Sequence, residues 1–177
     1  VLIMATNLQF IKEVSGTTIA TIKAEDIFSS NFDVYFIELE IEGTTTYNEI
    51  YLLDSNNNRL NHSTDDDEYD SALLVMKSNT TYAENVQSNT YVGWRELGVY
   101  VDNSGDGYGM SMYVYNPFDS SSYTFVTAQS AGMVGANLWG GKAIGSFTKA
   151  IQCNGLEFAN SGGGNMNYIK ASIYGVK

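Results

Sequence analysis

Strict alternation of residue character over residues 33–41 is the sequence feature that most limits the fold. The odd-numbered positions from 35 to 41 are all apolar: Tyr35, Ile37, Leu39 and Ile41. The positions between them are Val34, Phe36, Glu38 and Glu40, so this second set ends in two carboxylates. Successive side chains of a β-strand point to opposite faces of the sheet. A period of two therefore predicts a half-buried strand, with Tyr35 and Ile37 on its core side.

Similar short runs recur along the chain. Residues 108–116 alternate in the same way, and 123–128 are rich in the aromatic and Thr residues that strands favour. Further strands are expected at 8–14, 18–23, 48–53, 71–77, 92–101, 156–158 and 169–174. We expect 33–41 and 48–53 to pair as a hairpin around a turn at 43–45. The best helical candidate, 19–28, is short and contains Thr21.

About ten short strands, separated by turn residues roughly every 8–15 positions, are typical of an all-β fold. We expect a single-domain, jelly-roll-like antiparallel β-sandwich over residues 8–177, preceded by an N-terminal arm at 1–7. A chain of 177 residues buries about two-thirds of its unfolded surface, so it needs no disulfide or metal to hold a core. Cys153 is its one cysteine.

Charge limits the partners. The net charge is −11, and only 16% of the residues are charged. Nucleic-acid affinity comes largely from Lys and Arg at phosphates, so we expect no nucleic-acid binding, and the same sign disfavours anionic membranes. No apolar run approaches the ~18 residues that a membrane-spanning helix needs. The opening Val1–Ala5 is short for a signal peptide and lacks basic residues, so no export signal is expected.

The sequence favours no enzyme. The one histidine, His62, lies in a polar segment, and no strained Gly-x-Ser-x-Gly turn supplies a nucleophile. Cys153 has no candidate base nearby. Glu38 and Glu40 would lie about 7 Å apart on one strand face, within the range that glycosidases use. Alternating Glu is equally typical of a solvated strand, so a glycosidase or depolymerase is the weakest of the hypotheses.

Two acidic segments could hold calcium. Asp102, Ser104 and Asp106 stand at the first, third and fifth positions of a loop with Gly107 at the sixth, as in a calcium-binding loop. Tyr113 takes the twelfth position, where such loops carry a bidentate Glu. The second segment is 65–68, with Asp70 nearby. Hairpin turns explain both segments as well, so the prediction is no cofactor, with calcium as the alternative.

Tyr and Trp side chains are candidates for glycan contact, because their rings can stack on sugars. We single out Tyr91, Trp94, Tyr108 and Trp139. The competing interpretation places such rings in the core or between protomers.

Several blocks of sequence are similar to a known group of proteins. They are Asn116–Phe125, Lys142–Gly145, Gly155–Phe158, Ile173–Lys177 and the opening Leu8–Gly16. With these blocks the chain resembles small virion structural proteins of marine tailed phages, cyanophage-like ones especially, over nearly its whole length. The segment 65–70 departs from that resemblance. The resemblance implies a fibre knob or capsid decoration, often a homotrimer, on the virion surface after synthesis in the host cytoplasm.

The leading hypothesis is therefore a phage virion structural protein, a capsid-decoration or fibre-head subunit that contacts copies of itself, other virion proteins and a host surface glycan. The alternative is a lectin-like receptor-recognition module, calcium-assisted or not, whose aromatic side chains bind sugars.

Overall fold

The computed structural model describes residues 7–43, 48–60, 68–80, 82–91, 93–95, 97–98, 107–160 and 164–177, with the backbone alone for 85–91. It is an antiparallel β-sandwich, which confirms the expected all-β class, and the described residues form eleven strands where about ten were expected. The strands are β1 (Leu8–Ile19), β2 (Thr21–Ala24), β3 (Val34–Glu42), β4 (Asn48–Leu53), β5 (Tyr69–Lys77), β6 (Ala83–Tyr91), β7 (Gly107–Tyr115), β8 (Thr124–Val134), β9 (Asn137–Phe147), β10 (Gly155–Asn160) and β11 (Met166–Val176). The proposed arm at 1–7 lies outside the described residues except for Asn7.

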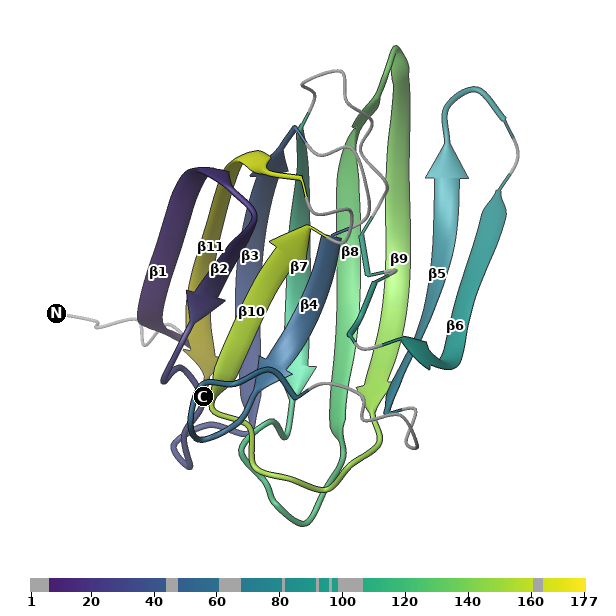
Figure 1. The fold of residues 1–177 in the computed structure, drawn as a ribbon. Helices are drawn as coiled ribbons and strands as arrows, with labels where there is room; N and C mark the ends of the chain where they lie inside the picture. The colour runs from purple at the N-terminus through teal and green to yellow at the C-terminus, as the bar shows by residue number, and fades with distance from the viewer. Residues whose placement is uncertain are drawn as a thin grey trace, which may run out of the picture.

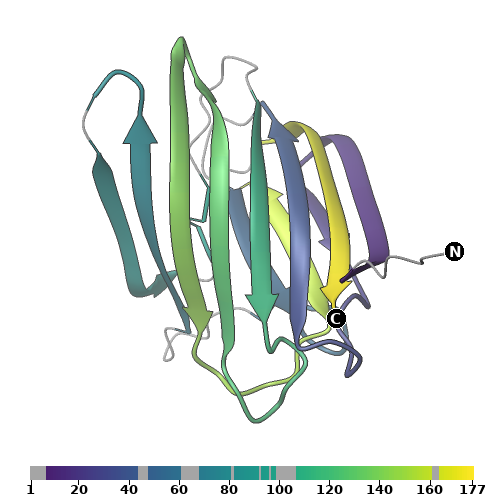
Figure 2. The same cartoon turned by 180° about the vertical axis from the view of Figure 1, so that it is seen from behind.

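The two sheets differ greatly in size. The large sheet has eight strands in the order β1-β11-β3-β7-β8-β9-β5-β6, and the small sheet has three in the order β2-β10-β4. Figure 1 shows the small sheet in front of the middle of the large one, with β9, β5 and β6 extending past it on one side. Figure 2, from behind, shows the opposite face of the large sheet, across which no other described segment runs. We call this opposite face the outer face.

The expected hairpin between 33–41 and 48–53 is wrong. β3 pairs with β11 and β7 in the large sheet, whereas β4 pairs with β10 in the small sheet. The alternation itself was assigned correctly, since Tyr35 and Ile37 of β3 are fully buried, as is Leu52 of β4. Both strands have an apolar side to bury, and placing them in opposing sheets buries both sides in one core.

Two strands were not expected from sequence, β6 and β9. β9 contains glycines that weaken a strand pattern, and Gly145 has a packing reason. A Cβ added there would lie 2.8 Å from Val126 Cγ1 and 3.1 Å from the indole of Trp94. The expected strand 92–101 is not found in its described part, where Trp94 forms only an isolated bridge with Ile50.

Aromatic side chains join the two sheets. Tyr69 of β5 is buried, with ring centroids 5.4 Å from Trp94 and 4.7 Å from Phe147. Its hydroxyl accepts a hydrogen bond from the backbone N–H of Leu52 (3.1 Å) and donates one to the carbonyl of Leu60 (2.9 Å). A buried hydroxyl needs such partners, so Tyr69 fixes where β4 and the segment after it lie against the large sheet.

Candidate functional site

Strand register places the outer-face residues in rows across the large sheet. Each row takes one residue from every strand, and the next row lies two residues further along. Phe36 of β3, for example, is opposite Tyr174 of β11 and Tyr113 of β7. The outer face can therefore be described row by row, from β1 at one edge to β6 at the other.

One row is aromatic across four adjacent strands, and we call it the aromatic row: Phe10 of β1, Tyr174 of β11, Phe36 of β3 and Tyr113 of β7. Neighbouring ring centroids are 5.7, 6.1 and 5.0 Å apart in that order. Phe10 is 57% and Tyr113 40% exposed, and the two rings between them are half-buried. The row presents ring surface to solvent instead of sealing it in the core.

The neighbouring row is polar, and we call it the polar row. In strand order it consists of Glu13, Ser172, Glu38, Ser111, Gln129 and Lys142. Ser172 Oγ donates a hydrogen bond to Glu13 Oε2 (3.1 Å), and Lys170 Nζ lies 3.2 Å from the same oxygen. The hydrogen bond to Glu13 is the main cause of the raised pKa of Lys170. Two adjacent rows thus pair ring surface with carboxylate, hydroxyl and amide groups.

The other half of the outer face, over β8, β9 and β5, carries mostly apolar exposed side chains on either side of the polar-row residues Gln129 and Lys142. Its exposed side chains form what we call the apolar patch: Leu74, Met76, Phe125, Met133, Leu138 and Ile144. Ile144 is 63% exposed and Leu138 56%. Most of the exposed large hydrophobic side chains among the described residues lie on the outer face, in this patch or at the aromatic end.

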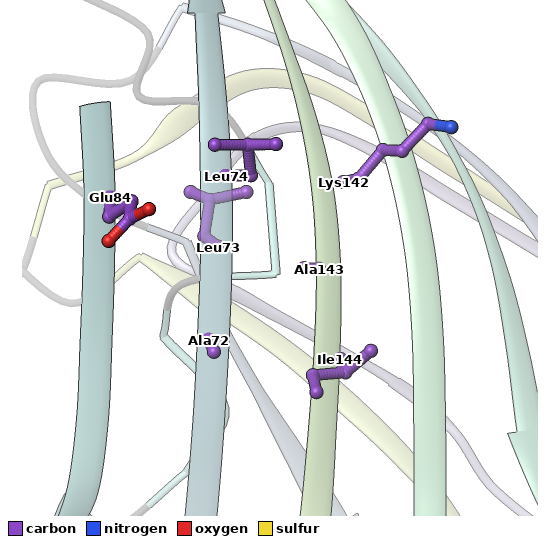
Figure 3. A pocket seen from close by; sticks show the side chains of 7 residues that line it. All are labelled: Ala72, Leu73, Leu74, Glu84, Lys142, Ala143 and Ile144. Carbon is purple, nitrogen blue, oxygen red and sulfur yellow. The ribbon is translucent and has the colours of Figure 1, made fainter. Parts of the chain in front are cut away.

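A shallow hollow of about 390 Å³ lies within the patch between β6, β5 and β9. Figure 3 shows Leu74 and Ile144 at its walls, Glu84 on the β6 side, and Lys142 extending away from Glu84. A second hollow, of about 580 Å³, lies near Met76, Leu138 and the ring of Trp139. The patch is uneven, which suits interdigitation with another surface.

A buried ionic cluster lies on the outward side of the small sheet. Arg59 Nη2 is 2.6 Å from Glu157 Oε1, and its guanidinium lies 4.1 Å from the ring centroid of Tyr51. Tyr51 donates a hydrogen bond to Glu49, and Arg95 Nε lies 3.7 Å from that same carboxylate. Burial, then the Glu49 contact, raises the pKa of Tyr51, which keeps it protonated. The cluster anchors the segments that contain Arg59 and Arg95 onto β4 and β10.

Two of the four sequence-predicted sugar contacts are corrected. Trp94 is fully buried and donates from Nε1 to the carbonyl of Ser146 (3.0 Å). Tyr108 is buried too, with Asn48 Nδ2 donating to its hydroxyl (3.1 Å), and burial raises its pKa to about 12. Both rings belong to the core because they occupy inward positions, which residue type alone does not reveal.

The other two have different outcomes. Trp139 is half-buried, and Lys77 Nζ lies 4.0 Å from its ring centroid. Only the backbone of Tyr91 is described, so its side chain lies outside the described part of the structure. The aromatic row was not predicted from the sequence. The available signal was the alternation along β3, which places Phe36 on the face of the strand away from the core residue Tyr35.

The calcium candidates Asp102, Ser104 and Asp106 lie outside the described residues, as do 65–67 and His62. Of the acidic segment, Glu68 Oε1 lies 2.6 Å from Lys149 Nζ, and Asp70 accepts from Ser146 Oγ at 3.5 Å. Within the described parts of the chain, no three His, Cys, Asp or Glu side chains group as a metal site would need.

The remaining catalytic candidates are placed as follows. Glu38 and Glu40 are exposed on the outer face, as their alternation predicted. Cys153 is fully buried, and burial raises its pKa to about 12, so its thiol is protonated at neutral pH.

Comparisons with known proteins identify no family for this chain. No family model matches the chain, and no curated protein matches it. Among solved structures it is similar to a marine PL-14 alginate lyase from Aplysia kurodai, with a TM-score of 0.37 and 8% identity over 97% of this chain and 87% of that one. It is also similar to lactose- and MES-liganded congerin II, with a TM-score of 0.23 and 13% identity over 93% of each chain. Similarity at these TM-scores carries no argument about activity.

In the part of the chain that is described, no helix is long and apolar enough to cross a membrane.

Proposed function

We propose that this chain is a non-catalytic structural subunit that assembles with further copies of itself through the apolar patch, as a component of the virion surface. The observation that carries the assembly role is the concentration of exposed Leu, Met, Ile and Phe side chains on one uncovered sheet face. A concentration of exposed apolar side chains on one face marks an interaction site. The virion setting rests on the sequence resemblance.

The size of the face suits a second copy. Contact from β8 to β6 would involve four strands, about 19 Å across, and β8 runs about 27 Å from Phe125 to Met133. These lengths correspond to roughly 500 Å² per copy, or about 1,000 Å² in total, which is the lower limit for a specific interface. Two such faces would pack about 10 Å apart with their side chains interdigitated.

Charge supports the same choice of partner. The chain carries a net charge of −11, so two copies repel each other over most of their surfaces. The charged side chains that line the first hollow of the patch are Lys142 and Glu84, which have opposite signs. The carboxylates Glu13, Glu38 and Glu40 lie on the other half of the outer face. Self-association is therefore least opposed at the patch.

Sedimentation and light scattering of the purified chain over a dilution series test the proposal. The wild type should be oligomeric, and Ile144→Lys should be monomeric, because an ammonium group would be buried in the contact. Phe10→Lys is the matched control: it also places Lys at an exposed apolar site of the outer face, but at the far edge, and it should remain oligomeric. Circular dichroism confirms that each variant is folded.

A wild-type chain that stays monomeric at high concentration would contradict the proposal, as would an oligomer indifferent to Ile144→Lys. A three-copy particle that Ile144→Lys disrupts would match the trimer that the phage resemblance implies, but it would overturn the packing of one patch on another, because identical patches that pack together close as a dimer.

A further inference from the structure

We infer that the aromatic row and the polar row together form a binding site for an extended, uncharged polysaccharide lying across the strands. This inference goes beyond the assembly role and concerns the other half of the outer face. It rests on the ring contacts from Phe10 to Tyr113, on the hydrogen-bonding groups beside them, and on the sign of the charge there.

The spacing of the row suits a polymer of sugars. Adjacent strands are about 4.8 Å apart, so the row offers a ring at intervals close to the length of one extended hexose residue. Ring centroids 5.7, 6.1 and 5.0 Å apart follow that repeat over four strands. Neighbouring rings are tilted to one another by 69°, 36° and 45°, so a glycan that crosses the four strands would contact ring edges as well as ring faces in succession.

The two rows match the two sides of a sugar. The C–H side of a hexose ring is apolar and packs against aromatic surface, while its hydroxyls need hydrogen-bond partners. Glu38 is opposite Ser111 in the polar row, and Gln129 follows on β8. A sugar chain stacked on the aromatic row would have its hydroxyls beside these carboxylate, hydroxyl and amide groups.

Charge selects the class of polysaccharide. Glu13, Glu38 and Glu40 lie on this half of the face, against Lys170, which is already 3.2 Å from Glu13, and Lys142 at the far end of the polar row. A carboxylated or sulfated polymer would meet net negative charge here, in a chain whose net charge is −11. Neutral hydroxyls, in contrast, can donate to carboxylates. The ligand expected is therefore a neutral glycan.

Sheet stabilisation alone does not account for the row. Aromatic pairs across strands do stabilise sheets. However, Phe10 remains 57% and Tyr113 40% exposed, which leaves ring surface in contact with water. A structural role predicts that removing a ring affects only the stability of the fold, whereas a binding role predicts an affinity loss that stability does not explain.

Calorimetric titration of the full chain tests the inference, with cellohexaose and laminarihexaose as neutral probes and hexagalacturonate as the acidic probe of equal length. Saturable binding of at least one neutral probe is expected, and no binding of the acidic one. Phe36→Ala and Tyr113→Ala should each weaken binding about tenfold, the loss expected for one buried contact. Tyr113→Phe keeps the ring and should retain most of the affinity. Urea unfolding of each variant separates affinity from stability.

Ile144→Lys is the control that separates this inference from the assembly role. It should abolish self-association and leave the affinity for the neutral probe unchanged. Absence of binding by both neutral probes at millimolar concentration overturns the inference, as do tighter binding of hexagalacturonate and an affinity unaffected by Phe36→Ala and Tyr113→Ala.

Discussion

Arg59 Nη2 lies 2.6 Å from Glu157 Oε1, although the two residues are 98 positions apart in the chain. The contact links the segment after β4 to β10, and the Glu157 side chain is only 4% exposed. The hydrogen bond to Glu157 is the main cause of the raised pKa of Arg59. The buried carboxylate therefore depends on this one guanidinium, which is fixed in turn by stacking on Tyr51.

Removing the guanidinium should be costly to stability. Arg59→Ala leaves Glu157 buried without its charged partner, and we expect the free energy of unfolding to fall by about 3 kcal/mol in urea titration. Arg59→Lys should recover only part of this lost stability, because an ammonium group lacks the planar surface and the several fixed N–H donors of a guanidinium. Glu157→Gln, which still accepts a hydrogen bond, should cost less than Arg59→Ala. Equal stability of Arg59→Ala and the wild type would show that the pair is not important to the fold.

Cys153 should make stability fall at alkaline pH. Burial raises the pKa of its thiol from 9.0 to about 12, so the folded chain favours the protonated form. The stabilisation that results is complete below about pH 9 and is lost as the pH rises from 9 towards 12. Urea midpoints measured over this range should decline more steeply for the wild type than for Cys153→Ala. Tyr108, whose pKa burial raises from 10.0 to about 12, should leave a remaining decline in the variant that begins near pH 10.

The same thiol should not react in the folded state. A protonated, fully buried sulfur reacts slowly with aromatic disulfide reagents, and urea should restore the reaction. Fast labelling of the native chain would mean that Cys153 is accessible.

Gly145 of β9 and Gly109 of β7 are two glycines of the large sheet with different surroundings. A Cβ at Gly145 would lie 2.8 Å from Val126 and 3.1 Å from Trp94, whereas a Cβ at Gly109 has nothing within 4 Å. Gly145→Ala should lower the free energy of unfolding by about 1–3 kcal/mol through overpacking, and it should change the fluorescence of Trp94. Gly109→Ala should be neutral or slightly stabilising. Similar values for both variants would contradict the packing assigned to β9.

Lys142 tests the electrostatics of the proposed assembly contact. Lys142→Glu adds a negative charge to the patch and should weaken self-association, with recovery at high salt because screening reduces the repulsion. Lys170→Glu changes the net charge equally but lies on β11, outside the patch, and should have a smaller effect on the dissociation constant measured by sedimentation. An identical effect of both variants would indicate a response to net charge alone.

Period-two alternation was enough to identify most strands and their inward faces. Tyr35, Ile37, Leu39 and Ile41 are buried as predicted, because the alternation of side chains along a strand is a local property of the backbone. The same alternation placed Glu38 and Glu40 together on the opposite face of the strand, where both are exposed.

Only the tertiary structure decided which strands are neighbours. β3 pairs with β7 and β11 instead of β4, and these pairings place Phe36 between Tyr113 and Tyr174. Trp94 and Tyr108 looked equally suited to a surface site, yet their inward positions bury them. Pairing and register depend on hydrogen bonds between segments far apart in the chain, so one strand's pattern cannot specify its partner or the row of side chains that the partnership creates.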